Sequence, residues 1–475
     1  MLVDMSDVDL LRYPRGFVLS GPDAGITESF ERCEVVDGLW VHPWVEVSYA
    51  SDANLVVVII GSCANVTAGQ LQEPAKFLLS KLIVGEERFA RALGELVGRY
   101  AVIFGRPEQM KVATDATGMR SVYYSASRGV VGSHARQVAE MIGTDTAPDP
   151  LSFHFGFPGF RTPFLGVKLL PPNTFLNIQA GRLERFWPRS APQVRSVDEA
   201  ASLAIEQATI GILRIASKRP VRLAMTSGLD SRLMLALLQH SGIDFESYTY
   251  GSDWRTGVDR AFAADLADAR GFRHSVIPAS KPSQPLARRL SEASYLRHHF
   301  NVVENLMSWF PGRDGLAMTG NLLEIGRRFF APMIRNGAAP PVTPESMAEL
   351  YRLKMGRTVR ARVDAAGRRE WIDNVSNIFA EYIEDTDFVR ASTRIDPYDL
   401  FYWEHRMGAW HGAAMNERDF YAEAFIPMNA RSIFEAMLGI DETNRESGSV
   451  FYRMIEMIDR TLLEFPVNPK RWLVR

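Results

Sequence analysis

Residues 221–238 read VRLAMTSGLDSRLMLALL, a stretch in which an apolar strand-like run changes directly into a helical pattern. The run VRLAM is typical of a buried strand, and the spacing of the apolar residues after Asp230 is typical of a helix. Between the two lies TSGLDS, 226–231, which combines hydroxyl side chains with a glycine and a carboxylate. The stretch therefore predicts a strand, a short polar turn and a helix over 230–240.

Strands and helices continue to alternate along the chain on both sides of this turn. A helical pattern covers 197–218, and the strand-like runs FESYTYGS (245–252) and HSVIP (274–278) flank the helical run 259–271. Alternation at this length predicts βαβ units and a parallel sheet. Helix dominates beyond residue 340, with a first candidate helix over 344–364. We therefore predict an α/β fold for the second part of the chain, with a helical C-terminal part.

The first part of the chain has a different pattern. Up to about residue 187 it consists mostly of short β-branched or aromatic runs, such as WVHPWVEVSYA (40–50), NLVVVIIG (54–61) and RYAVIFG (99–105). Successive strands with few helices predict an antiparallel α+β sandwich domain. A polar segment that contains prolines follows at 190–196. We therefore predict two domains, 1–192 and 193–475.

The composition excludes several classes of protein. The 475 residues are 46% hydrophobic and 23% charged with a formal net charge of −2, which gives no support for a nucleic-acid partner. Only Cys33 and Cys63 are present, which excludes a disulfide framework and a cysteine metal cage. The most apolar stretch, 54–66, is too short to span a membrane, and the acidic N-terminus is unlike a signal peptide. We expect a cytoplasmic protein with no membrane partner.

The turn at 226–231 lies where ligands bind in open parallel sheets, beyond the carboxyl ends of the strands. The first N–H groups of the following helix have no partners within the helix, and Gly228 permits close approach of an anion. A bare phosphate would be repelled by Asp230, whereas Mg²⁺ binds carboxylates and phosphates together. The alternative is an ordinary helix start that Ser227 or Asp230 caps.

TSGLDS resembles the phosphate loop S-G-G-x-D-S of the asparagine synthetase-like branch of the ATP pyrophosphatases (PP-loop type), with Thr226 for the first serine and Ser227 for the first glycine. LAMTGNLLEIGRRFF, 316–330, resembles the second motif of that family, S/T-G-x-G-x-[DE], with Leu322 at its second glycine. The resemblance implies a Mg²⁺ site at Asp230 and Glu324. It also implies an ATP site formed by Leu223, Thr226, Ser227, Gly228, Asp230, Ser231, Tyr250, Gly251, Thr319 and Gly320.

The first domain is similar to the glutaminase-type N-terminal nucleophile (Ntn-type) domain of the same family, through residues 98–126 and 170–187. A working glutaminase needs a thiol or hydroxyl at its processed N-terminus. Here Leu2 follows Met1, and both cysteines are remote from the terminus in sequence. We therefore expect a disabled glutaminase scaffold, as in β-lactam synthetases and the macrolactam cyclases of lasso peptides.

The resemblance implies an ATP- and Mg²⁺-dependent ligase that converts a carboxylate into an acyl-adenylate, releases pyrophosphate and forms an amide. The implied substrates are a small-molecule or peptide carboxylate and an amine, and a leader peptide or pathway protein is a further candidate partner. The amine source stays open between free ammonia, a separate amine and a group of the same molecule, which would close a lactam or macrolactam. A nucleotide-binding pseudoenzyme or assembly partner is the second alternative.

Two further residues are candidates for the chemistry. EFPVNPKRW, 464–472, is similar to a late basic stretch of the family, which implies that Lys470 stabilises charge during adenylation. Glu404 is a candidate base for the amine proton, with a solvated carboxylate on a helix face as its alternative. Arg327 and Arg328 could meet phosphate or end a helix. His298 and His299 are adjacent and lack a partner four residues on, which argues against a metal pair.

Overall fold

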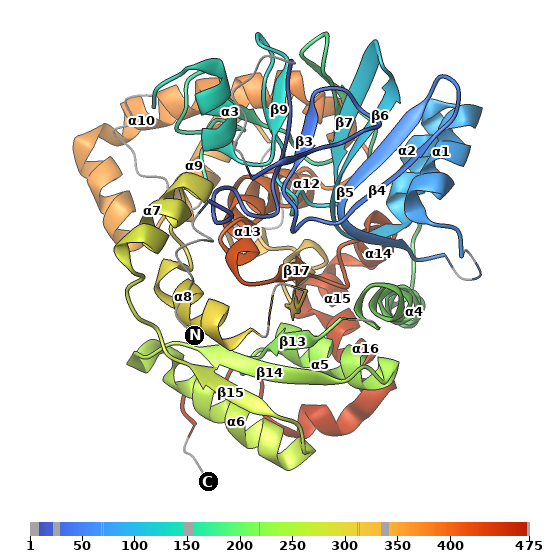
Figure 1. Ribbon diagram of the computed structural model, residues 1–475. Coiled ribbons are helices and arrows are strands. Elements are labelled where there is room, and N and C mark those ends of the chain that lie inside the picture. The colour runs from blue at the N-terminus through green and yellow to red at the C-terminus, as the bar shows by residue number, and fades with distance from the viewer. Residues whose placement is uncertain are drawn as a thin grey trace.

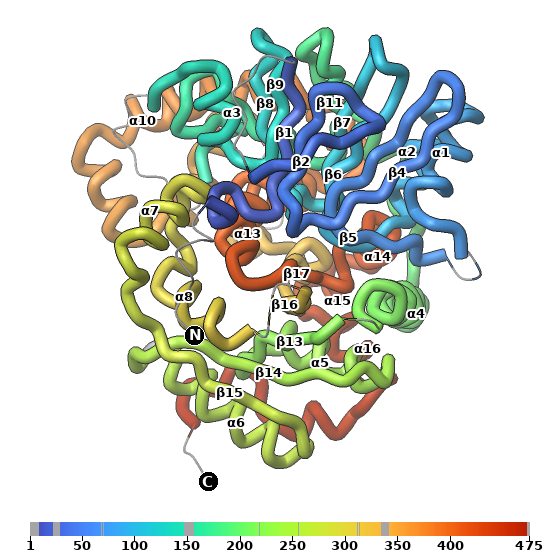
Figure 2. The backbone as a smooth tube through the Cα atoms, in the orientation of Figure 1, coloured from blue at the N-terminus to red at the C-terminus, as the bar shows by residue number. Residues whose placement is uncertain are grey.

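The computed structural model of the protein describes residues 9–21, 29–67, 69, 71–146, 156–217, 219–310, 312, 314–333 and 342–472. It contains two antiparallel sheets, one parallel sheet and a helical C-terminal part, which confirms the predicted mixture of α and β structure. The antiparallel sheets lie in the upper half of Figure 1, and the parallel sheet lies in the lower half. The same division is visible along the backbone tube of Figure 2.

Both antiparallel sheets have six strands and come from the first part of the chain. The first sheet has the order β10-β8-β9-β1-β3-β2, with strands at Lys168–Leu169, Tyr123–Ser125, Val130–Gly132, Phe17–Leu19, Leu39–Val41 and Glu31–Arg32. The second has the order β12-β11-β7-β6-β5-β4, with strands at Arg182–Arg185, Thr174–Asn177, Gln109–Thr114, Leu96–Arg106, Val56–Asn65 and Val47–Ser51.

Strand β5 explains why these two sheets stack. Its residues Val56, Val58 and Ile60 pack with strand β1 of the other sheet, whereas Val57 and Ile59 join the cluster that contains α1 (Pro74–Val84) and α2 (Glu86–Ala92). Alternate residues of a strand point to opposite faces, so a strand buried on both faces needs a continuous apolar run. Helix α3 (Ala135–Ile142) packs against the other sheet, which gives helix–sheet–sheet–helix layers.

The parallel sheet has the order β15-β14-β13-β16-β17, and every neighbouring pair is parallel. Its strands are His274–Ile277, Phe245–Tyr250, Val221–Ala224, Leu316–Met318 and Glu423–Phe425. From β13 the chain first adds strands on one side and then returns to add β16 and β17 on the other. The strand order therefore reverses between β13 and β16, and such a switch point opens a crevice at the carboxyl ends of the strands.

Helices cover both faces of the parallel sheet. One face packs against α4 (Val197–Ala216), α5 (Leu229–Ser241), α6 (Gly257–Arg270) and α16 (Ser449–Asp459). The other packs against α7 (Gln284–Ala293) and α8 (Phe300–Trp309). The predicted parallel sheet is therefore confirmed, although the three-residue strands β16 and β17 have no counterpart among the predicted strands.

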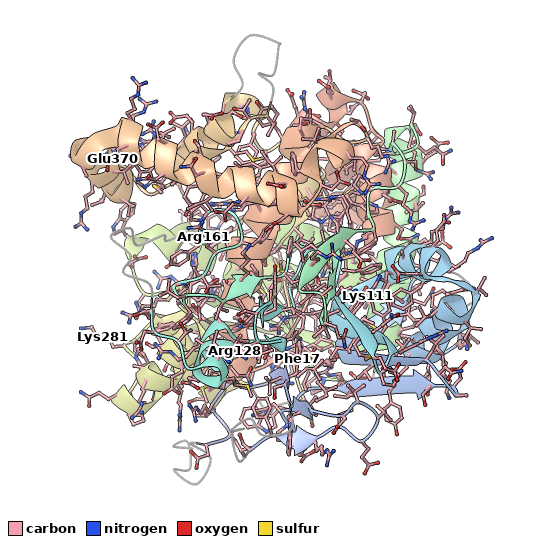
Figure 3. All side chains as sticks on the ribbon, turned by 90° about the horizontal axis from the view of Figure 1, so that it is seen from above. Phe17, Lys111, Arg128, Arg161, Lys281 and Glu370 are labelled. Carbon is pink, nitrogen blue, oxygen red and sulfur yellow. The ribbon has the colours of Figure 1, made fainter. Side chains whose placement is uncertain are left out.

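The C-terminal part is helical, as predicted. Its remaining helices are α9 (Pro344–Leu353), α10 (Arg357–Asp385), α11 (Phe388–Ser392), α12 (Pro397–Phe401), the π-helix Tyr402–Gly412, α13 (Ala413–Met415), α14 (Arg431–Leu438) and α15 (Glu442–Ser447). The single helix predicted over 344–364 is wrong in one respect, because extended backbone at Gly356 separates α9 from α10. Figure 3 shows α10, which carries Glu370, at the edge of the molecule.

Buried ion pairs join the antiparallel sheets to the parallel sheet. Arg99 on β6 binds the carboxylate of Asp419 with both terminal nitrogens, and Arg120 donates to Glu423 on β17 over 3.0 Å. Burial opposes the ionisation of Glu423, but Arg120, Arg15 and Arg219 outweigh it and lower the pKa of this carboxyl to about 2. The two parts of the chain are therefore held together by charges that have no access to water.

This low pKa predicts that acid weakens the fold. An exposed Glu titrates near about 4.3, so ionised Glu423 stabilises the folded state at and above about pH 5. The stabilisation is lost as the pH falls through the folded pKa of about 2, because the unfolded chain takes up the proton first. We expect the unfolding midpoint in urea to fall steadily below pH 5. A midpoint that stays constant from pH 5 to pH 3 would contradict this expectation.

Three predictions from the sequence need separate comment. The boundary at 192/193 falls between β12 and α4 and stays a prediction. Leu2, on which the expected loss of glutaminase chemistry depends, lies outside the described residues. Within the described part of the chain, the helices are too short or too polar to cross a membrane.

Candidate functional site

A cavity of about 350 Å³ opens at the switch point of the parallel sheet. Its walls come from the ends of β13, β14 and β16 and from the segments that follow them. The predicted nucleotide residues in its walls are Thr226, Asp230, Ser231, Tyr250, Thr319 and Gly320. The fold thus brings six of the predicted nucleotide-binding residues to one cavity, although they come from segments far apart in the chain.

The turn between β13 and α5 is held in shape by its own hydroxyl groups. The Thr226 N–H donates to Ser231 Oγ over 3.2 Å, and the Gly228 N–H donates to Thr226 Oγ1 over 3.2 Å. Thr226 Oγ1 and Ser231 Oγ lie 3.0 Å apart. The first turn of α5, which begins at Leu229, points its N–H groups toward this bend. The N–H groups of the turn itself are thus engaged, and the donors left for an anion are those of the first turn of α5 beside the hydroxyls of Thr226 and Ser231.

Ser227 is held outside the cavity by a carboxylate that the sequence did not single out. Its N–H and its Oγ both donate to Asp259 Oδ1, over 2.8 and 2.6 Å. Asp259 lies in the first turn of α6 and lines the cavity. An acid in a first helical turn is common, so nothing in the residues around Asp259 favours a binding role for it. The substitution of the motif's glycine by Ser227 is accommodated by this contact.

The second motif lies directly on the first. A Cβ on Gly320 would stand 2.5 Å from the carbonyl oxygen of Asp230, so only a glycine permits this approach. Two residues later Leu322 has a φ of +77°, in the left-handed region that favours glycine. Leu322 stands where the resembled motif has its second glycine. Leu322 thus adopts a backbone conformation that a glycine would adopt more readily.

The close contact at Gly320 gives a testable prediction. In Gly320→Ala the new Cβ would force the segment after β16 away from the turn, because the obstructing atoms belong to the backbone. We expect Mg·ATP affinity, measured by calorimetry, to fall at least about tenfold, which is about 1.4 kcal/mol. Gly356→Ala is the matched control, since nothing lies within 4 Å of a Cβ there. Equal affinities in the two variants would contradict the contact between the motifs.

Asp230 and Glu324, the predicted metal ligands, lie close enough to influence one another. Burial, and then the Asp230 carboxylate, raise the pKa of Glu324. Arg327 pairs with Asp230 through both terminal nitrogens, and the charges of Arg327 and Arg406 partly offset the rise. Arg327 therefore meets the carboxylate, whereas Arg328 pairs with Glu442 and Glu446 on α15. A carboxylate raises the pKa of a neighbouring acid, and a cation beside the pair lowers it again, which is the position Arg327 occupies here.

The donor set fits Mg²⁺. Two carboxylates supply the hard oxygen ligands that Mg²⁺ prefers, and phosphate oxygens commonly complete its shell. In addition, Thr319 is 3% exposed and lines the cavity, and its Oγ1 is buried without a hydrogen-bond partner among the described residues. The described residues contain no group of three or more His, Cys, Asp or Glu that could hold a metal alone. A metal here would therefore need a ligand that brings its own oxygens.

The C-terminal segment lies over the turn. Buried Arg232 donates to the carbonyl of Ser227 and to those of Phe465 and Pro466, and the Asn468 N–H donates to Ser227 O over 3.0 Å. Lys470 follows two residues later and is exposed, outside the cavity wall. The contact between Asn468 and Ser227 brings the backbone near Lys470 close to the turn. The role of Lys470 in adenylation stays a prediction. Arg232, which fastens this segment, was not among the predicted residues.

Other predicted positions lie away from the cavity wall. Leu223 is fully buried within β13, and Gly251, with a φ of +132°, packs against Thr256 just after β14. Gly228 caps α5 with extended backbone. These three residues shape the strands and the turn, but the cavity wall does not include them.

Glu404 is wrong as a candidate base. Its side chain is fully buried on the π-helix, where Arg185 binds both carboxylate oxygens over 2.6 and 3.0 Å. Asn173 and Tyr382 donate to the same carboxylate. It is not a solvated helix-face residue either. The group instead joins the C-terminal helices to β12, and it has no access to an amine in the cavity.

The adjacent histidines are engaged by neighbouring residues. His298 Nε2 accepts from the Trp410 indole over 2.6 Å, and His299 faces the carboxylate of Glu417. Burial lowers the pKa of His299, which keeps the imidazole neutral near pH 7.

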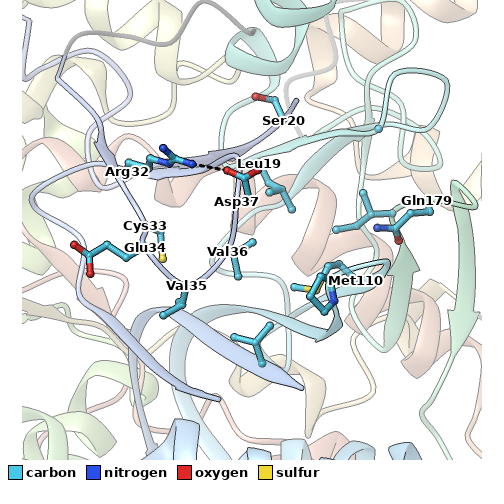
Figure 4. Close-up of a pocket in the computed structure, with 14 residues that line it drawn as sticks. Leu19, Ser20, Arg32, Cys33, Glu34, Val35, Val36, Asp37, Met110 and Gln179 are labelled. Atoms are coloured by element: carbon cyan, nitrogen blue, oxygen red, sulfur yellow. Dashed lines mark hydrogen bonds and ion pairs between the residues drawn. The ribbon is translucent and has the colours of Figure 1, made fainter. Parts of the chain in front are cut away.

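A larger cavity of about 910 Å³ lies in the first part of the chain (Figure 4). Its wall carries apolar side chains such as Val36 and Met110, together with Cys33. The charged pair Arg32–Asp37 in this wall is already matched, with 2.6 Å between the two side chains. The cavity at the switch point offers more polar groups to a ligand, namely hydroxyls, carboxylates and unpaired donors. We therefore take the cavity at the switch point as the candidate functional site.

No protein-family model and no curated protein matches the chain. Among solved structures it is similar to glutamine phosphoribosylpyrophosphate amidotransferase from B. subtilis, complexed with ADP and GMP, at 15% identity and a TM-score of 0.21 over 59% of each chain. It is also similar to the allosteric regulatory enzyme of purine biosynthesis, at 14% identity and a TM-score of 0.24, over 73% of this chain and 76% of that one.

Proposed function

We propose that the protein is an ATP- and Mg²⁺-dependent ligase that activates a carboxylate as an acyl-adenylate and couples it to an amine. One observation carries this proposal. The hydroxyl-rich turn after β13, the segment after β16 and the Asp230 carboxylate line one cavity at the switch point of a parallel sheet. Glu324 is not part of that wall, but it lies close enough to Asp230 for the charge of Asp230 to raise its pKa. This arrangement suits a triphosphate held together with a divalent cation.

In this proposal the first domain, 1–192, serves as a disabled glutaminase-like (Ntn-type) scaffold, and 193–475 forms the asparagine synthetase-like ligase domain. The layered sheets and the parallel sheet with its helices are compatible with that division. The protein would then need no glutamine, and the amine would enter as ammonia, as a second substrate or as part of the acyl substrate.

The proposed reaction has two steps. A carboxylate oxygen attacks the α-phosphorus of ATP, the bond to the β-phosphate oxygen breaks, and pyrophosphate leaves. An amine nitrogen then attacks the activated carbonyl, AMP leaves with its electron pair, and the nitrogen loses a proton to solvent. Mg²⁺ would neutralise phosphate charge as it develops. The N–H groups of the first turn of α5 and the Thr319 hydroxyl would orient the phosphates, and Lys470 is the candidate cation for the α-phosphate.

Exchange of labelled pyrophosphate into ATP tests the first step. We expect exchange that requires Mg²⁺ and a carboxylic acid, with a panel of mono- and dicarboxylic acids as probes. With an ¹⁸O-labelled acid, one label should appear in AMP once amide forms. Formation of ADP instead of AMP would contradict the proposal. The mass of the product then separates condensation with an added amine from ring closure with loss of one water.

The pseudoenzyme alternative has its own support. Arg327 and Asp259 already satisfy groups that a nucleotide and metal would need, namely Asp230 and the Ser227 N–H. A nucleotide-binding protein without chemistry would bind Mg·ATP but show no acid-dependent exchange. Both proposals therefore predict Mg·ATP binding, and only the ligase proposal predicts acid-dependent pyrophosphate exchange.

A further inference from the structure

Arg418 is a buried cation in the wall of the candidate site, and among the described residues it has no hydrogen-bonded carboxylate, although the charge of Glu417 acts on it. It is 5% exposed, it lines the cavity, and its Nε and Nη1 have no hydrogen-bond partner among the described residues. A guanidinium stays protonated at any physiological pH, and a buried charge without a partner is costly. Other buried arginines, such as Arg99 and Arg445, each bind a carboxylate of the protein.

The acids next to Arg418 are engaged elsewhere. Asp419 binds Arg99 and Arg120. The carboxylate of Glu417 accepts from Ser294 Oγ over 2.8 Å and from the N–H groups of the two residues at 298 and 299. The remaining neighbours are tyrosines, and burial raises the pKa of Tyr248 and Tyr421, so that their hydroxyls stay neutral. Arg418 therefore lines the cavity, and its Nε and Nη1 are buried without a hydrogen-bond partner among the described residues.

Arg418 enters the cavity from the opposite edge of the sheet to the phosphate turn. The turn follows the carboxyl end of β13, whereas Arg418 precedes the amino end of β17, and both strands run parallel to β16 between them. Arg418 thus reaches the same cavity from another strand than the phosphate turn, so it is available for an anionic group other than the phosphates.

We propose that Arg418 binds a carboxylate of the acyl substrate other than the carboxylate that is activated. The substrate is then an acid with at least two carboxylates, one directed to the nucleotide and one to this arginine. The planar guanidinium matches a carboxylate through parallel N–H donors, and the surrounding tyrosines supply apolar walls. This inference rests on the proposed function for the identity of the substrate, but the anion site itself does not.

Arginine Nε–H signals of the ¹⁵N-labelled protein test the proposal. Formate, the smallest carboxylate, is the probe, and sodium chloride at equal ionic strength is the control. The signal of Arg418 is assigned by its loss in Arg418→Lys, or in Arg418→Gln if the first variant is insoluble. We expect formate to shift this signal in a saturable way, with and without saturating Mg·ATP. The signal of Arg445, which is bonded to Asp399, should not move.

The affinity for Mg·ATP shows whether the anion at Arg418 is a carboxylate of the acyl substrate or a phosphate of the nucleotide. We expect Arg418→Lys to bind Mg·ATP within about twofold of the wild-type affinity and to lose the response to formate. A signal that ignores formate would overturn the proposal. So would displacement of formate by Mg·ATP together with a tenfold loss of ATP affinity in Arg418→Lys, because Arg418 would then bind phosphate. Failure of the wild-type protein to bind Mg·ATP would instead contradict the proposed function.

Discussion

Asp230→Asn is expected to weaken Mg·ATP binding at least about 100-fold, or about 2.8 kcal/mol. The substitution keeps the size of the side chain but removes one of the two negative charges that would bind the cation. Glu324 alone would then hold a metal that brings the charge of a triphosphate with it. Calorimetric titration of the purified protein with Mg·ATP measures the effect directly.

The fold should tolerate this change. Asp230 and its partner Arg327 are each about one-quarter exposed, and ion pairs of that kind contribute about 1 kcal/mol or less. Asp268→Asn, an exposed acid on the neighbouring helix α6, is the matched control and should bind Mg·ATP as the wild type does. Unchanged affinity in Asp230→Asn, with a normal unfolding midpoint, would show that Asp230 has no part in nucleotide binding.

Glu423→Ala is expected to destabilise the protein by about 3–5 kcal/mol. Glu423 is 1% exposed and lies against Arg120, Arg15 and Arg219, so its removal leaves buried guanidinium groups without their counter-charge. Unfolding in urea, followed by tryptophan fluorescence, measures the effect as a lower midpoint.

Two comparison variants make this result specific. Glu456→Ala removes an exposed acid that pairs with Arg453 on the surface, and we expect a change below about 1 kcal/mol. Glu423→Gln keeps the volume but not the charge, so it should also flatten the loss of stability below pH 5. If Glu423→Ala and Glu456→Ala unfold at the same urea concentration, the buried charges do not hold the two sheet systems together.

The local patterns of the sequence predicted much of the fold. The turn at 226–231 is recognisable because a strand, a polar bend and a helix follow one another within 18 residues. The continuous apolar run of β5 likewise indicates, from the sequence alone, a strand that is buried on both faces. The three-residue strand β17 was missed because so short a run has no measurable periodicity, and only its pairing with β16 makes it a strand.

The candidate site was predictable only where its residues share a local motif. Asp259 reaches the turn from 32 residues away, and Arg418 reaches the cavity from the far edge of the sheet. Nothing in their own neighbourhoods distinguishes them from an ordinary helix start or a surface arginine. Glu404 shows the opposite error, because helical spacing cannot distinguish a face turned to solvent from one buried against another part of the chain.

A crystal structure with Mg²⁺ and α,β-methylene-ATP tests the central claim most directly. We predict triphosphate density over the turn at 226–231, in contact with Gly320, and a metal bound by both Asp230 and Glu324 after Arg327 has moved away from Asp230. A nucleotide bound elsewhere, or at the turn with neither carboxylate on its metal, would contradict the account.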